Sequence, residues 1–213
     1  MGVFGVYKFY EGGILLRRGE FLNIKNNIIK SNLNNLYNVI FYLVEMIDEE
    51  LRQKGERLLK QGFALGDTSG KIGNLEERNV FALVSKNFEY TILSTSSEKK
   101  KIFQKLKKKN KNYSNLRCYQ IIHSVEIYLA LRNYISSSCP GFYICPEGFA
   151  PRWIKYYLMQ FLGSLKKINV ESLTPMFGKD NIADKVAGDL RGKKGKTPTL
   201  TLKESDFKKL NLI

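Results

Sequence analysis

The chain has 213 residues, of which 43% are hydrophobic, and it carries a formal net charge of +15. This length allows one large or two small domains, and the hydrophobic content excludes an intrinsically disordered chain, because disorder requires low hydrophobicity together with high charge. No run of about 18 apolar residues occurs, so we expect no membrane-spanning helix. The N-terminus lacks the order of basic, apolar and small residues that marks a signal peptide, which makes a cytoplasmic protein the default expectation.

The excess of positive charge is the strongest bulk feature. The chain contains 35 Lys and Arg residues against 20 Asp and Glu residues. Such an excess attracts phosphate backbones, because cationic side chains release the counterions condensed on them. The chain is also rich in Lys, Asn and Ile, a bias that an AT-rich genome gives to all its proteins. A protein that is basic through genome bias therefore remains an alternative.

The three cysteines are irregularly spaced, and the chain has a single histidine. An odd number of cysteines without a recurring spacing predicts reduced thiols rather than a disulfide framework. The spacings also match no common zinc-binding pattern, so we expect no zinc site.

Residues 1–62 are expected to form an N-terminal extension. The segment 3–24 predicts two strands, separated by a turn at Glu11-Gly12-Gly13. Apolar residues at steps of three and four predict a long helix over about 32–60, and Gly62 marks its end.

Residues 63–192 are expected to form an α/β core. Three strands are predicted first, in FALGDTSG, NVFALVSK and FEYTILS, followed by a lysine-rich helical segment at 99–111 and a helix over 115–134. The strand FYIC comes next, then a helix that begins at Pro151 and runs to about Leu165. The strand KINVESL and a short helix over 180–190 complete the core. This order predicts a mixed sheet flanked by helices, whose first three strands form a meander.

Residues 193–213 are expected to form a basic C-terminal tail, within which TLTLKESDF is able to pack as a strand.

Acidic residues stand at predicted strand ends and on helices of the core. In FALGDTSGKIG, Asp67 ends a buried run and is followed by small residues; Glu147 follows the strand FYIC. Asp180 and Asp184 stand four residues apart at the start of the last helix, hence on one face. Glu126 lies within the first long helix of the core.

Carboxylates at the ends of neighbouring strands meet along one edge of an α/β sheet, where they repel one another. A divalent cation removes this repulsion, and Mg²⁺ or Mn²⁺ suits carboxylate and water ligands. Two such ions can bind both the attacking water and the leaving oxygen of a phosphodiester. The candidate catalytic residues are therefore Asp67, Glu126, Glu147, Asp180 and Asp184. The expected metal ligands among them are Asp67, Glu147 and Asp180.

The order of elements and the positions of these acids resemble the ribonuclease H-like fold. The segment GKDNIADKVAGDLRG resembles the type 2 ribonuclease H pattern, in which an Asp precedes a small-residue helix with a motif of the form AxxxAKVxRD. Here that segment supplies Asp180, Ala183, Lys185, Val186 and Asp189. The resemblance places DTSG at the family's opening Asp-Glu-Ala-Gly turn and Glu147 at its Asp after a strand. Thr68 stands where the family has a Glu, so this ligand is missing unless Glu126 or Asp184 supplies it.

Each acid also has an alternative, purely structural interpretation. Asp67 is a possible Asx-turn former, and Glu147 a possible exposed turn residue. Asp180 suits a helix cap, and Asp184 a surface position paired with a lysine. Glu126 suits a position on the surface of its helix. Convergence of three or more of these carboxylates would overturn the structural interpretations together.

Basic and aromatic residues suggest a surface for nucleic acid. Eight lysines lie between Lys99 and Lys111, and like charges at that density favour an anionic partner. Arg152 and Lys155 stand near the start of a helix, where a phosphate is well placed, and Trp153 or Tyr156 could stack on a base. Helical spacing instead favours a core position for Trp153 and Tyr157. The candidate nucleic-acid-binding residues are Lys99, Lys100, Lys101, Lys105, Lys107, Lys108, Lys109, Lys111, Arg152, Lys155, Arg191, Lys193 and Lys194.

The leading hypothesis is a nucleic-acid-binding protein of ribonuclease H-like architecture that cleaves phosphodiesters with Mg²⁺ or Mn²⁺. RNA, DNA and an RNA–DNA hybrid are all open as its partner, and no membrane partner is expected. Two alternatives remain: a non-catalytic nucleic-acid-binding module with a degenerate site, and a structural or partner-binding protein that is basic through genome bias.

Overall fold

The computed structural model describes residues 46, 49–135, 138–171, 181–192 and 197–213. The chain divides into two compact units, Met1–Ile47 and Asp48–Ile213, and the description that follows concerns the second. The predicted N-terminal hairpin lies outside the described residues, as do Asp180, Lys193 and Lys194. Residues 49–60 are helical, in agreement with the C-terminal part of the predicted long helix.

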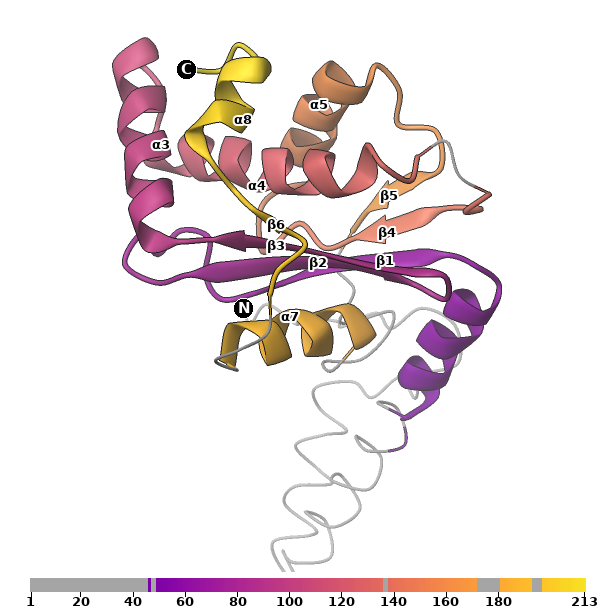
Figure 1. Cartoon of the computed structure of the whole chain (residues 1–213). Helices are drawn as coiled ribbons and strands as arrows, with labels where there is room; N and C mark the ends of the chain where they lie inside the picture. Colours follow the sequence, from indigo (N-terminus) through magenta and orange to yellow (C-terminus); the bar gives the residue numbers. More distant parts are fainter. Residues whose placement is uncertain (1–45, 47–48, 136–137, 172–180, 193–196) are drawn as a thin grey trace, which may run out of the picture. The chain divides into compact units, whose positions relative to one another are not determined.

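A mixed sheet forms the centre of this unit, with the strand order β5-β4-β1-β2-β3-β6 among the described residues (Figure 1). The strands β1, β2 and β3 form the predicted antiparallel meander, while β4 runs parallel to β1, β5 parallel to β4, and β6 parallel to β3. The bounds are β1 Ala64–Ser69, β2 Asn79–Ser85, β3 Phe88–Ser94, β4 Phe142–Ile144, β5 Ile168–Val170 and β6 Leu200–Thr201. The predicted mixed α/β class is confirmed.

Helices cover both faces of the sheet (Figure 1). The helix α4 lies over one face, with α3, α5 and α8 on the same side, and α7 packs against β1 and β2 from the other. Their bounds are α3 Ser96–Lys109, α4 Asn115–Leu131, α5 Pro151–Leu162, α7 Ile182–Gly192 and α8 Glu204–Lys209.

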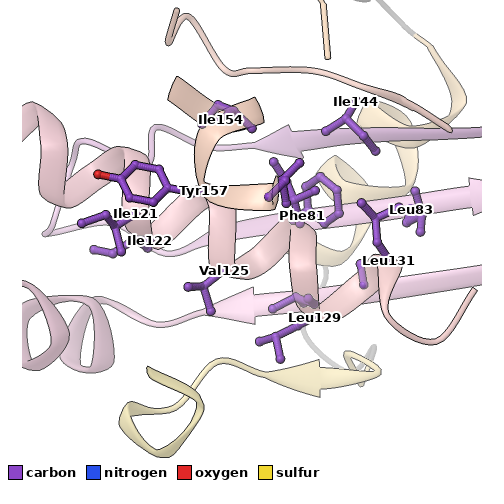
Figure 2. Close-up of a cluster of buried hydrophobic side chains, with 14 of the residues drawn as sticks. Phe81, Leu83, Ile121, Ile122, Val125, Leu129, Leu131, Ile144, Ile154 and Tyr157 are labelled. Atoms are coloured by element: carbon purple, nitrogen blue, oxygen red, sulfur yellow. The ribbon is translucent and has the colours of Figure 1, made fainter. Parts of the chain in front are cut away.

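Alternating side chains of the central strands fill two cores, one on each face. On the α4 side, Phe81 and Leu83 of β2 are fully buried and belong to the larger core, part of which Figure 2 shows. On the α7 side, Val80 and Ala82 pack with small residues of the helix, including Ala183. Because successive side chains of a strand point to opposite faces, a strand that is apolar throughout must be covered on both sides.

The C-terminal segment differs from the predicted strand. Only Leu200 and Thr201 pair with β3, after which the chain turns into the short helix α8. The Asp206 carboxylate accepts a hydrogen bond from the Lys203 N–H at 3.0 Å and so caps this helix. A side chain that offers the backbone a cap competes with strand pairing, which is why TLTLKESDF does not remain extended.

Within the part of the chain that the structure describes, every helix is too short or too polar to cross a bilayer.

Candidate metal centre

The parallel pairing of β1 with β4 places Asp67 beside Cys145. Gly66 pairs with Ile144 at the end of β4, and the Cys145 N–H donates to the Gly66 carbonyl at 2.8 Å. Only a glycine fits at position 66, because a Cβ atom there would lie 2.7 Å from Ile144 Cδ1 and 2.8 Å from Phe81 Cζ. The close approach of these side chains to the β1 backbone therefore fixes the register that brings Asp67 and Cys145 together.

Asp67 is not the last residue of its strand. The pairing of β1 with β4 ends at Gly66, whereas its pairing with β2 continues to Ser69. Asp67 is therefore paired with β2 on one side and lies beyond the end of β4 on the other. Its side chain is 8% exposed and faces α7. One carboxylate oxygen accepts from the Thr68 N–H at 2.8 Å, and the other accepts from the side-chain amide of Asn181 at 2.6 Å.

Asn181 joins the start of α7 to Asp67. Its side-chain oxygen accepts hydrogen bonds from the backbone N–H groups of Ala183 at 3.0 Å and Asp184 at 3.1 Å, as an N-cap residue does. Its side-chain nitrogen donates to Asp67. A single buried amide therefore both begins the helix and holds the carboxylate, and it places Asp184 in the first turn of a helix attached to Asp67.

Glu147 lies in a tight turn directly after β4. The Phe149 N–H donates to the Pro146 carbonyl at 2.9 Å, and the two central residues have positive φ angles, 51° for Glu147 and 73° for Gly148. Positive φ at both positions is typical of a type I′ turn. Glycine adopts this conformation freely, whereas a glutamate there stores backbone strain, and such strain is often found at functional sites.

Asp67, Cys145 and Glu147 form a group that could hold a metal ion. One ligand atom from each side chain lies within 4.8 Å of the other two. Asp67 is buried, and Cys145 and Glu147 are half-buried. Two of the three ligands predicted from the sequence thus meet, one on β1 and one in the turn after β4; the third, Asp180, lies outside the described residues.

The Glu147 carboxyl and the Cys145 thiol of this group both ionise less readily than they would in water. Burial raises the pKa of Glu147 to about 7, and the carboxylates of Asp67, Glu126 and Asp184 add to this rise against an opposing contribution from His123. Burial, together with the charge and hydrogen bond of Asp67, raises the pKa of the Cys145 thiol to about 12. The thiol is therefore a hydrogen-bonding partner of Asp67 at neutral pH.

Glu126 belongs to a separate, buried network on the α4 side of the sheet. One of its oxygens accepts from Asn79 Nδ2 at 2.8 Å and from the Ser94 hydroxyl, and the other lies 3.3 Å from His123 Nδ1. The other ring nitrogen of His123 lies 3.1 Å from the Cys145 carbonyl oxygen. Glu126 is thus fully buried and partnered, contrary to the surface interpretation, and through His123 its network reaches the backbone of Cys145, just before the turn that holds Glu147.

The predicted basic residues are distributed unevenly. Lys99 is fully buried and donates to the Asn74 carbonyl at 2.7 Å, so it does not contribute to a surface. Five other lysines of the 99–111 segment already have partners inside the chain: Lys100 with Glu76, Lys101 with Glu98, Lys105 with Glu204, Lys107 with the Tyr113 carbonyl and Lys109 with the Asn211 carbonyl.

The remaining basic candidates lie at the surface or close to it. Lys108, Lys111, Arg152 and Lys155 are exposed. Arg191 is half-buried at the end of α7, with its guanidinium 3.5 Å from Glu77.

Two residues of the site were not predicted from the sequence. The role of Asn181 could have been predicted, because an Asn directly before a helix of small residues is a favoured N-cap. The role of Cys145 could not have been predicted, because its position beside Asp67 follows from the register between β1 and β4. No family model, characterised protein or solved structure matches the chain.

Proposed function

We propose that this chain is a metal-dependent nuclease with a ribonuclease H-like architecture. The observation that carries the proposal is the convergence, within 4.8 Å, of Asp67 on β1 and Glu147 in the turn after the adjacent parallel strand β4. The chain order of a three-strand meander, helices, a strand, a helix, a strand and a helix supports the architecture, because the resemblance seen in the sequence rests on that order.

The energetics of the group favour a binding role over a structural one. A carboxylate with a pKa of about 7 is less stable in its charged form here than in water, so its ionisation weakens the fold. A bound divalent cation would reverse that effect by neutralising Asp67 and Glu147 together. A carboxylate with a raised pKa that lies beside a second carboxylate is typical of functional sites.

The donor set fits a hard cation. Carboxylate oxygens are the ligands that Mg²⁺ and Mn²⁺ prefer, and a thiol with a pKa of about 12 is a poor ligand for either ion. Asp67 and Glu147 would therefore hold the ion, with Asp184 in the nearby first turn of α7. Such an ion, when bound, activates water and neutralises charge on a phosphodiester. Cys145 and Asn181 would orient Asp67 through their hydrogen bonds to its carboxylate.

The charge of the chain favours nucleic acid as the substrate. A net charge of +15 attracts phosphate backbones at long range. Arg152 and Lys155, both exposed, lie on α5, which begins four residues after Glu147.

A cleavage assay tests the proposal. Single-stranded RNA, an RNA–DNA hybrid and single-stranded DNA would each be incubated with the full chain and Mg²⁺, Mn²⁺ or EDTA. We expect cleavage of at least one substrate with Mg²⁺ or Mn²⁺ and none with EDTA. Asp67→Asn, which removes the charge but keeps the shape, should abolish it, whereas Glu89→Gln, at an exposed position on β3, should not.

The contrary outcomes are distinct. Absence of metal-dependent cleavage, together with equal Mn²⁺ binding by the wild type and Asp67→Asn, would remove the nuclease proposal. Binding that falls steeply with salt and ignores divalent cations would then indicate the non-catalytic module. Loss of all retention on nucleic acid at about 150 mM salt would indicate a protein that is basic through genome bias.

A further inference from the structure

Large apolar side chains are exposed together on α5 and at the start of α4. Trp153, Tyr156 and Met159 of α5 are 37%, 45% and 49% exposed, and Leu116 of α4 is 57% exposed. These four account for most of the strongly exposed large apolar residues among those that the structure describes. Trp153 and Tyr156 are neighbours, and exposed apolar side chains that lie together commonly mark an interaction site.

The two faces of α5 are clearly divided. Ile154, Tyr157 and Leu158 are buried, and Figure 2 shows Ile154 and Tyr157 within the core on the α4 side. Trp153 and Tyr156 are three residues apart and so share the other face. The predicted core position is therefore confirmed for Tyr157 and wrong for Trp153.

The two exposed rings meet at nearly a right angle. Their centroids lie 6.2 Å apart, and the angle between the ring planes is 83°. Two guanidinium groups stand close to the indole: the central carbon of Arg117 lies 5.9 Å from the Trp153 ring centroid, and that of Arg152 lies 5.7 Å from it. The surface thus combines two flat aromatic rings with two guanidinium groups.

The sequence of this surface is free of acidic residues. No Asp or Glu occurs between Glu98 and Glu126, or between Glu147 and Glu171. These stretches supply most of α3, the first two-thirds of α4 and the whole of α5. A partner that combines planar apolar groups with repeated negative charge is complementary to such a surface.

We infer that this face of α5 binds a single-stranded nucleic acid by stacking unpaired bases on Trp153 and Tyr156, with Arg117 and Arg152 at its phosphates. Bases of a single strand expose their faces to aromatic side chains, whereas those of a duplex are stacked on each other. The inference rests on the proposed function, since it names the substrate class of that site. The short loop from Glu147 to the start of α5 joins the metal centre to this surface.

Trp153 is the only tryptophan of the chain, so its fluorescence reports directly on this surface. The full chain would be titrated in EDTA, at about 150 mM salt, with a dT oligonucleotide, a U oligonucleotide and a DNA duplex of equal length. We expect saturable quenching by both single strands and weaker quenching by the duplex. An unchanged emission at saturating oligonucleotide, with binding seen by anisotropy, would place the strand elsewhere and overturn the inference.

Variants measured by anisotropy of a labelled single strand make the test quantitative. Trp153→Ala and Tyr156→Ala should each weaken binding about 5- to 100-fold, as expected for loss of one stacked base. Trp153→Phe keeps an aromatic ring and should retain most of the affinity. Ile182→Ala, at a similarly exposed apolar residue (39%) of α7 on the opposite face of the sheet, is the matched control and should bind like the wild type. Equal affinities for all four variants would overturn the inference.

The outcomes separate this inference from the proposed nuclease activity. Ring-dependent binding without metal-dependent cleavage would support the surface and remove the nuclease. Metal-dependent cleavage of single strands with the same KM in wild type and Trp153→Ala would support the nuclease and overturn the surface. If sedimentation instead shows a dimer that Trp153→Ala dissociates, with no affinity for the oligonucleotides, the face binds a second copy and the inference fails.

Discussion

Substituting Glu147 by Gln should change how the stability of the protein depends on pH. The pKa of Glu147 is raised from its ordinary value of 4.5 to about 7, chiefly by burial. Between these two values the folded chain binds more protons at this site than the unfolded chain, so the free energy of unfolding falls as pH rises. Below about pH 4.5 the wild type carries no penalty, and above about pH 7 it carries the full penalty.

The difference between the two pKa values corresponds to about 3 kcal/mol, as an upper estimate. Because Gln cannot ionise, Glu147→Gln lacks this loss. As pH rises from 4.5 to 8, the free energy of unfolding of Glu147→Gln should therefore increase relative to that of the wild type by up to about 3 kcal/mol.

Urea denaturation in EDTA over pH 4.5–8 provides the measurement. Glu89→Gln, which removes an equal charge at an exposed position on β3, controls for the general effect of making a basic protein more basic. Addition of Mn²⁺ at pH 8 should stabilise the wild type and leave Glu147→Gln nearly unchanged. Stability curves of wild type and Glu147→Gln that run parallel across the whole pH range would refute the reasoning, because they would mean that the carboxylate is not destabilised when charged.

Two further substitutions test how the site is built. Gly66→Ala should lower the free energy of unfolding by about 1–3 kcal/mol, because its Cβ atom would lie less than 3.0 Å from atoms of Ile144 and Phe81. Gly192→Ala is the control, because open space surrounds that position. Similar urea midpoints for the two variants would contradict the packing argument. Asn181→Ala should lower the free energy of unfolding by about 1–3 kcal/mol and weaken Mn²⁺ binding. Asn181→Ser keeps an N-cap hydroxyl but cannot reach Asp67, so it should restore stability more than metal affinity. Equal recovery of stability and metal affinity would argue against a separate link from Asn181 to Asp67.

The order of elements was predictable because their signals are local. Apolar runs bounded by turns gave the meander of β1, β2 and β3, and Pro151 marked the start of α5. The end of α5 was placed too late because Gly163, in the left-handed conformation with φ 71°, ends the helix after Leu162. In each case the signal lies within a few residues of the feature that it predicts.

The details of the site depend on distant residues and were harder to predict. Asp67 and Glu147 are separated by 80 positions, and only the pairing of β1 with β4 brings them together. The exposure of Trp153 was mispredicted because an aromatic residue at helical spacing is usually buried, and only the packing of α5 on α4 decides which ring faces inward. Residue spacing gives the period of a helix but not the direction in which its apolar face points.

Two carboxylates of this fold, the fully buried Glu126 and the half-buried Glu147, have opposite environments, and this contrast is the physical basis of the proposed function. Glu126 accepts hydrogen bonds from Asn79 and Ser94, and His123 Nδ1 lies 3.3 Å from its other oxygen, so the protein itself supplies its polar partners. Glu147 lies beside Asp67 in a strained turn, and burial together with nearby carboxylates raises its pKa to about 7.

A carboxylate that the fold satisfies contributes to stability, and evolution can retain it for that reason alone. A carboxylate that weakens the fold whenever it is charged has no such justification, because an amide of the same shape would be more stable. In the proposed function, a group bound from outside the chain supplies the compensation that Glu147 lacks. A divalent cation shared with Asp67 is the simplest group that could supply it.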